Sequence, residues 1–173
     1  MTGMRSKPHR PEFLRRLATV LAATLALAGN TLAFAQNGQL EDLASFPRGP
    51  LEISDGKKVK LTFDVWLADN PQRQTQGLMF VRALPDKRGM LFVHESPKPI
   101  SMWMKNTYIP LDMVFIDAQG HIQQIVEQTT PHSLDIIRSN DPALAVLEIA
   151  GGEAKRLGLR PGQLVVHPAL AKR

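Results

Sequence analysis

The segment from Ser101 to Asp112 carries the densest group of side chains that can bind or react. In it, Trp103 is followed by three neighbouring hydrogen-bond donors, Lys105, Asn106 and Thr107. An aromatic ring beside convergent donors is typical of a pocket for a small polar ligand, so this loop is a candidate binding site. The alternative is that the amide and the hydroxyl bond to their own backbone in a turn, while the lysine stays in solvent.

Two carboxylates, Asp112 and Glu148, interrupt apolar runs that are typical of strands. Alternation along a strand places Asp112 on the face of Val114 and Glu148 on the face of Val146. A half-buried acid needs a cation or several donors, because leaving it unpaired costs several kcal/mol or makes it take up a proton. The candidate cations are Arg73, Arg82, Arg88 and Lys105.

The pattern leaves two interpretations of this acidic pair open. Asp112 and Glu148 can act as general acid and base on a glycan, which would make the protein an enzyme of the cell envelope. They can equally form two structural ion pairs that fix the register of the strands. The sequence does not decide whether the protein is an enzyme.

The methionines suggest a third possibility. Five of them, Met79, Met90, Met102, Met104 and Met113, fall within 35 residues of one another. Thioether and imidazole ligands suit Cu(I), so Met102, Met104 and His94 are candidates for a copper(I) carrier, whereas the alternative is that methionine fills gaps in a small core.

Other familiar chemistry is missing from the sequence. It has no cysteine, no GxSxG, Walker or HExxH motif, no GxGxxG after a strand, and no ligand-like pairing of histidines. We therefore expect no resident metal or cofactor, no disulfide and no thiol nucleophile.

The N-terminal segment is typical of a secretory signal peptide over residues 1–35. Five basic residues accompany an apolar run of about twelve residues, Leu17 to Ala28, and Ala33-Phe34-Ala35 supplies small residues for cleavage before Gln36. The run is shorter than the roughly twenty residues of a membrane span, so an uncleaved anchor is the less favoured alternative. The sequence thus predicts a periplasmic or secreted protein with no permanent membrane span after cleavage.

The expected mature chain is close to neutral. Five of the 21 Lys and Arg residues and one of the 16 Asp and Glu residues precede Gln36, which leaves 16 positive and 15 negative charges, or +1. This balance argues against nucleic acid as a partner, because nucleic-acid binding usually needs a clustered basic face. The remaining 138 residues have the usual length of a single domain.

Turn residues divide the mature chain into short elements. Pro47, Gly49 and Pro50 indicate a flexible tether over residues 36–50, followed by one domain over residues 51–173. Asn70, Pro71 and Gly77 bracket one short helix, and a second is expected from Gly152 to Leu157, ended by Gly158. The fold class is mainly β (α+β), a compact β-barrel or β-sandwich of about seven short strands with two short helices. The predicted strands are Val59–Leu67, Met90–Val93, Ile100–Met104, Leu111–Ile116, His121–Val126, Leu144–Ile149 and Leu164–Val166.

A series of short motifs runs through the expected domain. It consists of Arg73, Gly77-Leu78-Met79, Arg82, Gly89-Met90-Leu91-Phe92, Trp103-Met104-Lys105-Asn106-Thr107, Pro110-Leu111-Asp112, Val146-Leu147-Glu148 and Gly151. This series resembles the prokaryotic family called domain of unknown function 192. The resemblance covers about Leu51 to Val166 and implies a single-domain, mainly-β fold that is commonly exported, with no activity or cofactor to carry over. It directs attention to the loop from Lys105 to Asp112, with Arg73, Arg82 and Glu148.

The sequence alone favours a periplasmic binding or accessory module. Its partner would be a small polar ligand, such as a sugar or a carboxylate, or an envelope component. The predicted ligand-binding residues are Arg73, Arg82, Trp103, Lys105, Asn106, Thr107, Asp112 and Glu148.

Overall fold

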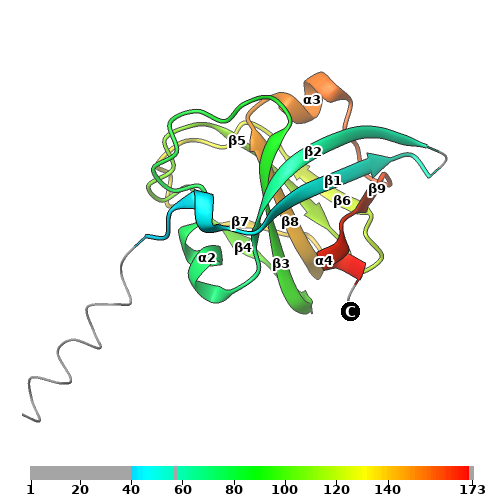
Figure 1. Ribbon diagram of the computed structural model, residues 1–173, viewed down its shortest axis with the longest axis horizontal. Coiled ribbons are helices and arrows are strands. Elements are labelled where there is room, and N and C mark those ends of the chain that lie inside the picture. Colours follow the sequence, from blue (N-terminus) through cyan, green and yellow to red (C-terminus); the bar gives the residue numbers. More distant parts are fainter. Residues whose placement is uncertain (1–39, 57, 172–173) are drawn as a thin grey trace, which may run out of the picture. The chain divides into compact units, whose positions relative to one another are not determined.

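The computed structural model describes residues 40–56 and 58–171, so the predicted signal peptide and its cleavage site lie outside the described residues. Seven strands form one sheet in the order β6-β5-β8-β3-β2-β1-β9, and β4 pairs with β7 in a second, two-stranded sheet (Figure 1). The strands are β1 (Arg48–Ser54), β2 (Val59–Ala68), β3 (Arg88–Lys98), β4 (Ser101–Met102), β5 (Leu111–Ile116), β6 (Ile122–Val126), β7 (Ile137–Arg138), β8 (Ala143–Ala150) and β9 (Leu164–Val166).

The large sheet curls into a half-barrel whose two edges meet at one end. The pair β2 and β3 is parallel, and all other neighbouring strands of this sheet are antiparallel. Where the edges meet, the Val165 N–H donates to the Gly120 carbonyl, and the Ile122 N–H donates to the Gln163 carbonyl. These bonds satisfy groups that an open sheet edge would expose. The predicted mainly-β fold is confirmed.

Both predicted helices are present. In α2 (Pro71–Gln76), the Asn70 side chain accepts a hydrogen bond from the Arg73 N–H, and Gly77 ends the helix with a φ of 49°. In α3 (Glu153–Leu157), Gly158 ends the helix in the left-handed region. The sequence did not indicate two shorter elements, the 3-10 helix η1 (Leu43–Ser45) and α4 (Pro168–Ala171). In the part of the chain that the structure describes, no helix has the length and hydropathy of a membrane span.

The fold begins earlier than the predicted tether allows. Phe46 is buried, and β1 starts at Arg48, which pairs with Trp66 of β2. Pro50 lies within this strand and has no N–H to donate. The strand tolerates it because β9 pairs only with Glu52 to Ser54, so β1 is an edge of the sheet at Pro50. Residues 41–50 are therefore part of the folded unit and not a flexible tether.

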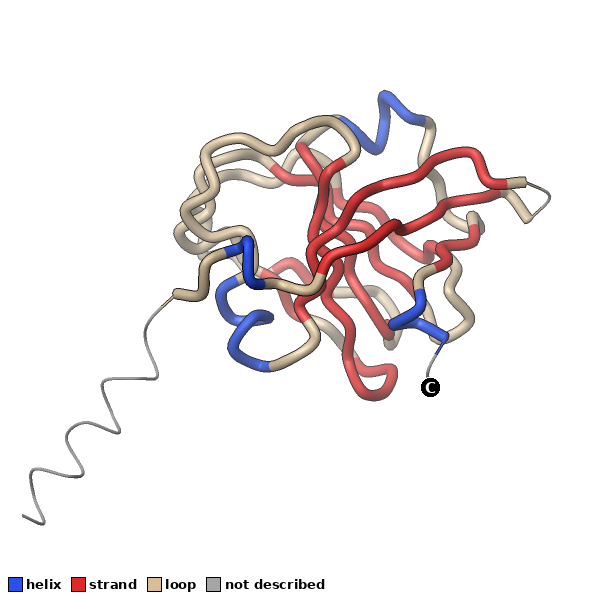
Figure 2. The backbone as a smooth tube through the Cα atoms, in the orientation of Figure 1, coloured by secondary structure: helices blue, strands red, loops and turns tan. Residues whose placement is uncertain are grey.

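The sheet separates two apolar cores. The inner face of the curl buries side chains from every strand of the large sheet, including Phe63, Leu91 and Leu147. The outer face buries Phe92 and Phe115 under segments that lie outside this sheet. Beside it, three loops over residues 77–87, 103–110 and 127–136 run together at one end of the molecule (Figure 2), joined by hydrogen bonds from Phe80 N to Asn106 O and from His132 N to Thr107 O.

Candidate functional site

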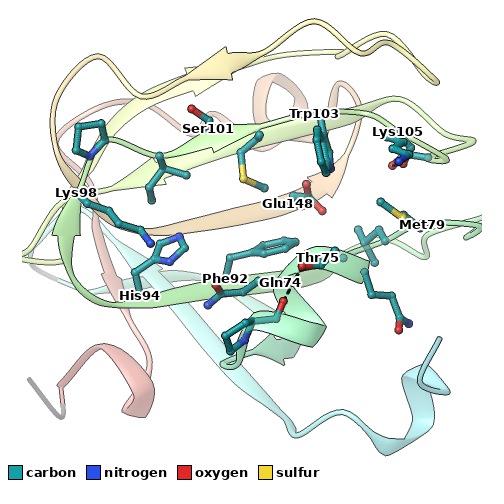
Figure 3. Close-up of a pocket in the computed structure, with 18 residues that line it drawn as sticks. Gln74, Thr75, Met79, Phe92, His94, Lys98, Ser101, Trp103, Lys105 and Glu148 are labelled. Carbon is teal, nitrogen blue, oxygen red and sulfur yellow. Dashed lines mark hydrogen bonds between the residues drawn. The ribbon is translucent and has the colours of Figure 1, made fainter. Parts of the chain in front are cut away.

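A cleft of about 450 Å³ opens on the outer face of the sheet. Its walls come from α2 and the residues that follow it, the end of β3, the β4 strand and the loop after β4. One residue of β8, Glu148, also lines it, and Figure 3 shows this carboxyl group in the middle of the cleft. Segments from four separate parts of the sequence thus enclose one acidic side chain.

Glu148 is the most perturbed group in the cleft. Its side chain is only 4% exposed, and no hydrogen bond or ion pair among residues 40–56 and 58–171 involves its carboxyl group. Burial raises the pKa of Glu148 to about 8, because removal from water disfavours the charged form. At neutral pH this glutamic acid is largely protonated, so it can both donate and accept a hydrogen bond.

Aromatic side chains form much of the apolar lining. Phe92 of β3 and Trp103 of the following loop lie on either side of Glu148 (Figure 3). Trp103 is 44% exposed, and the Lys105 Nζ lies 5.7 Å from the centre of its ring. A large exposed ring held in place by a cation offers a flat surface on which a ligand can stack.

The basic residues lie toward the ends of the cleft. Figure 3 shows His94 and Lys98 at one end and Lys105 at the other, with Glu148 between them. Both lysines are exposed, and neither forms an ion pair with a described residue. The charged lining of the cleft is therefore mainly positive when Glu148 is protonated.

Local contacts set the position of Glu148. Its strand, β8, lies between β3 and β5, and Gly89 of β3 pairs with Ile149. A Cβ atom at Gly89 would come within 2.5 Å of the Glu148 carbonyl oxygen, so only glycine fits there without a shift of the strands. Across the cleft, the Gln74 side chain donates to the Val93 carbonyl at 2.8 Å and ties α2 to β3.

Asp112 occupies a different place from Glu148. It pairs with Ile149, whereas Glu148 pairs with Met113, so the two carboxyl groups point to opposite faces of the sheet. The predicted faces are confirmed: Val114 belongs to the inner core and Val146 to the outer one. The sheet separates the two acids, and the hypothesis that they act together on one glycan is wrong.

Asp112 satisfies its charge with backbone donors. It is fully buried, and its oxygens accept three hydrogen bonds of 2.8 Å from the N–H groups of Gln128, Gly152 and Ala154. Several such donors can hold a buried carboxylate without a cation. This side chain joins three segments of the fold and has no contact with the cleft.

The two predicted arginines also lie outside the cleft lining. Arg73 bonds to Glu41 and Asp69 at 3.1 and 3.0 Å, and its guanidinium group lies 5.2 Å from the centre of the Phe46 ring. Arg82 lies 4.9 Å from the ring centre of Tyr108. Both cations stabilise neighbouring loops.

The two polar residues in the turn after Trp103 lie in different places, Asn106 outside the cleft lining and Thr107 in it. Asn106 has a φ of 56°, and its carbonyl accepts from the Phe80 N–H, outside the cleft. Thr107 lines the cleft, but its hydroxyl donates to the Lys105 carbonyl at 3.4 Å. The structure thus brings four of the eight predicted residues to the cleft, Trp103, Lys105, Thr107 and Glu148.

The candidate copper ligands do not all meet. Met102 and His94 line the cleft together with Met79, but Met104 is buried, and its sulfur accepts from the Thr129 hydroxyl at 3.1 Å. In the described part of the chain, no group of three or more His, Cys, Asp or Glu side chains has the arrangement of a metal site.

Several residues of the cleft were not among the predicted ligand-binding residues. Gln74 reaches the cleft because α2 folds back over β3, which no local pattern indicates. Met79 was named only in the methionine cluster and the family motif, and His94 only as a candidate copper ligand. The position of His94 is a signal, because it follows an apolar run directly and keeps the face of Phe92.

A family model matches most of the folded unit. The model of domain of unknown function 192 (DUF192), described as an uncharacterized ACR, matches residues 52–167. This chain belongs to the DUF192 family. A search of curated proteins found no match.

Two solved structures are similar to this DUF192 protein. One, from Sinorhizobium meliloti 1021 and described as a "putative transcription regulator", is 38% identical and has a TM-score of 0.69, covering 76% of this chain and 99% of its own. The other, a protein of unknown function from Novosphingobium aromaticivorans DSM 12444, is 33% identical with a TM-score of 0.69, covering 75% of this chain and 91% of its own.

Proposed function

We propose that this DUF192 protein is an exported binding module whose cleft holds a small polar ligand. The observation that carries the proposal is Glu148, a buried carboxyl group without a hydrogen bond or ion pair in the described structure, facing a cleft beside an exposed tryptophan. A ligand that bonds to Glu148 and stacks on Trp103 would use both features.

Energetics support a role in binding over a role in stability. A polar group that is fully removed from water without a partner costs about 1 to 3 kcal/mol, which is an upper bound for Glu148 because its carboxyl group faces the cleft. An apolar side chain of similar volume at this position would avoid the cost. Asp112 shows the contrast, because three backbone N–H groups compensate its burial. No described protein group hydrogen-bonds to the Glu148 carboxyl group. A ligand in the cleft would supply the missing hydrogen bond.

Export is supported by the sequence pattern of residues 1–35. Expression of the full chain in a Gram-negative host should yield a periplasmic product that begins at Gln36. N-terminal sequencing of the periplasmic fraction tests this, and a cytoplasmic product that retains Met1 overturns it.

The description of the S. meliloti protein as a transcription regulator raises the question of nucleic acid. The predicted mature chain has a net charge of only +1, which does not favour a phosphate backbone as ligand. A small molecule remains the proposed partner.

The indole N–H signals of the two tryptophans provide a direct test of binding. Trp103 lines the cleft, whereas Trp66 lies under the guanidinium group of Arg88, 5.0 Å from its ring centre. Titration with a panel of monosaccharides and small carboxylic acids, followed by proton–nitrogen correlation NMR, should shift the Trp103 signal and leave Trp66 unchanged. If no compound shifts Trp103, or if both signals shift together, the cleft is not the binding site.

A further inference from the structure

Resting on the proposed function, we infer that the cleft selects a small carboxylate with an apolar body, whose oxygen accepts a hydrogen bond from the protonated Glu148. The inference names the ligand class and a proton-dependent mode of binding. It rests on the charges of the cleft, on Glu148 as the one acidic residue that lines it, and on the apolar side chains of the lining.

The charges favour an anion. Lys98 and Lys105 line the cleft without ion-pair partners among the described residues, and Glu148 is its one acidic lining residue. A cationic ligand would have to pass two unpaired ammonium groups. An anionic ligand gains from both, because complementary charge favours encounter and binding.

The protonated acid gives the anion a specific contact. Desolvation raises the pKa of Glu148 to about 8, so its hydroxyl proton is retained at neutral pH. A hydrogen bond from a carboxylic acid to a carboxylate oxygen is short and strong, because the acceptor carries charge. The ionised form of Glu148 would instead repel the ligand, so binding must weaken as the pH rises through about 8.

The apolar side chains that line the cleft favour a ligand with an apolar body. Phe92 and Trp103 lie on either side of Glu148, and Met102 lines the same wall (Figure 3). Contact with aromatic faces and a polarizable thioether suits a planar, apolar group of the size of a phenyl ring.

Other charged groups near Glu148 could also make ligand binding depend on pH, so the experiment must distinguish their contribution from that of Glu148. His94 and Lys98 come from β3 and Lys105 from the loop after β4, while α2 contributes the uncharged Gln74 and Thr75. Lysine keeps its charge well above neutral pH, and histidine ordinarily titrates between about pH 5 and 8. A glutamine at position 148 removes only the acid, so it distinguishes the effect of Glu148 from that of His94.

The experiment uses the expected mature protein, residues 36–173, and three probes of one shape. Para-fluorobenzoate, para-fluorobenzamide and para-fluorobenzamidine share a ring and a planar head group but are anionic, neutral and cationic, respectively. Fluorine NMR gives the Kd of each at pH 7 and pH 9. For a pKa of about 8, the protonated fraction of Glu148 falls about tenfold between these conditions, so the Kd of the benzoate should rise about tenfold.

Two variants complete the design. In Glu148→Gln the benzoate should still bind at pH 7, because the amide also donates a hydrogen bond, and its Kd should not change between pH 7 and pH 9. The matched control is Arg82→Gln, which changes an exposed cation outside the cleft and should keep the wild-type pH dependence.

The outcomes separate the two proposals. Preferential binding of the benzoate, with a loss at pH 9 that Glu148→Gln abolishes, supports the inference. Equal or tighter binding of the benzamide or benzamidine, or a pH dependence that persists in Glu148→Gln, overturns the inference but leaves the cleft as a binding site. If none of the probes binds and the sugar and acid panel also leaves the Trp103 signal unchanged, both proposals fail.

Discussion

Replacement of Glu148 by glutamine should change the pH dependence of stability in a defined direction. The pKa of Glu148 is raised from 4.5 to about 8 in the folded protein, because the carboxyl group is buried without a compensating partner. Between these values the folded state keeps a proton that the unfolded state releases. The free energy of unfolding therefore falls as the pH rises from about 4.5 to 8, and it levels off above that range.

The size of the effect follows from the shift. A change of about 3.5 pH units at 1.36 kcal/mol per unit corresponds to about 5 kcal/mol between the two ends of the range. Glutamine does not titrate and has nearly the same shape. The variant should thus gain up to about 5 kcal/mol over the wild type on going from pH 4.5 to pH 9, whatever its stability at low pH.

Urea unfolding at a series of pH values measures this difference, with the wild type, Glu148→Gln and a control analysed in parallel. The control is Glu127→Gln, which removes an exposed carboxyl group and should follow the wild-type curve. Apart from the replaced carboxyl groups, the titrating groups are the same in the three proteins, so they cancel in the comparison. Parallel curves for the wild type and Glu148→Gln would refute the argument that this carboxyl group is protonated in the folded state.

Three further substitutions test the fold and the site. Asp112→Asn should destabilise the protein by about 3 kcal/mol in urea unfolding, because three buried N–H groups lose part of their acceptor, whereas Asp117→Asn, in an exposed turn, should cost about 1 kcal/mol. Gly89→Ala should cost at least about 2 kcal/mol because its Cβ would strike the backbone of β8, while Gly49→Ala, with no atom closer than 4.0 Å, should be nearly neutral; equal effects would contradict the packing argument. Trp103→Ala should raise the Kd of para-fluorobenzoate about tenfold in fluorine NMR and change the melting temperature little, because the ring is 44% exposed; unchanged affinity would exclude stacking.

Local sequence patterns predicted many of the strands and both of the longer helices. Alternation of apolar and polar residues located β2, and short apolar runs between turn residues located most of the other strands of the large sheet. Asn70 marked the start of one predicted helix, and Gly158 marked the end of the other. These signals work because strand alternation and helix capping depend on neighbours in the sequence. The first strand was missed because Gly49 and Pro50 resemble a loop, and only its edge position in the sheet allows the proline.

Strand alternation also predicted on which face of the sheet Asp112 and Glu148 lie, but it did not predict what each carboxyl group contacts. It placed Glu148 with Val146 and Asp112 with Val114, as the structure does. The partners of an acid come from other segments: Asp112 accepts hydrogen bonds from residues 16 to 42 positions away, and no pattern around it indicates them.

By itself, the sequence determined the mainly-β class, the two short helices and the loop that carries Trp103 and Lys105, because each depends on short-range periodicity or on a local motif. Only the tertiary structure decided which of the candidate residues share a cleft. The packing of α2 and the end of β3 over the outer face of the sheet brings Gln74 and His94 beside Glu148, while Arg73 and Arg82 bond elsewhere. Contacts between segments that are distant in the sequence depend on how the sheet curls and on what covers it, and residue spacing does not encode that directly.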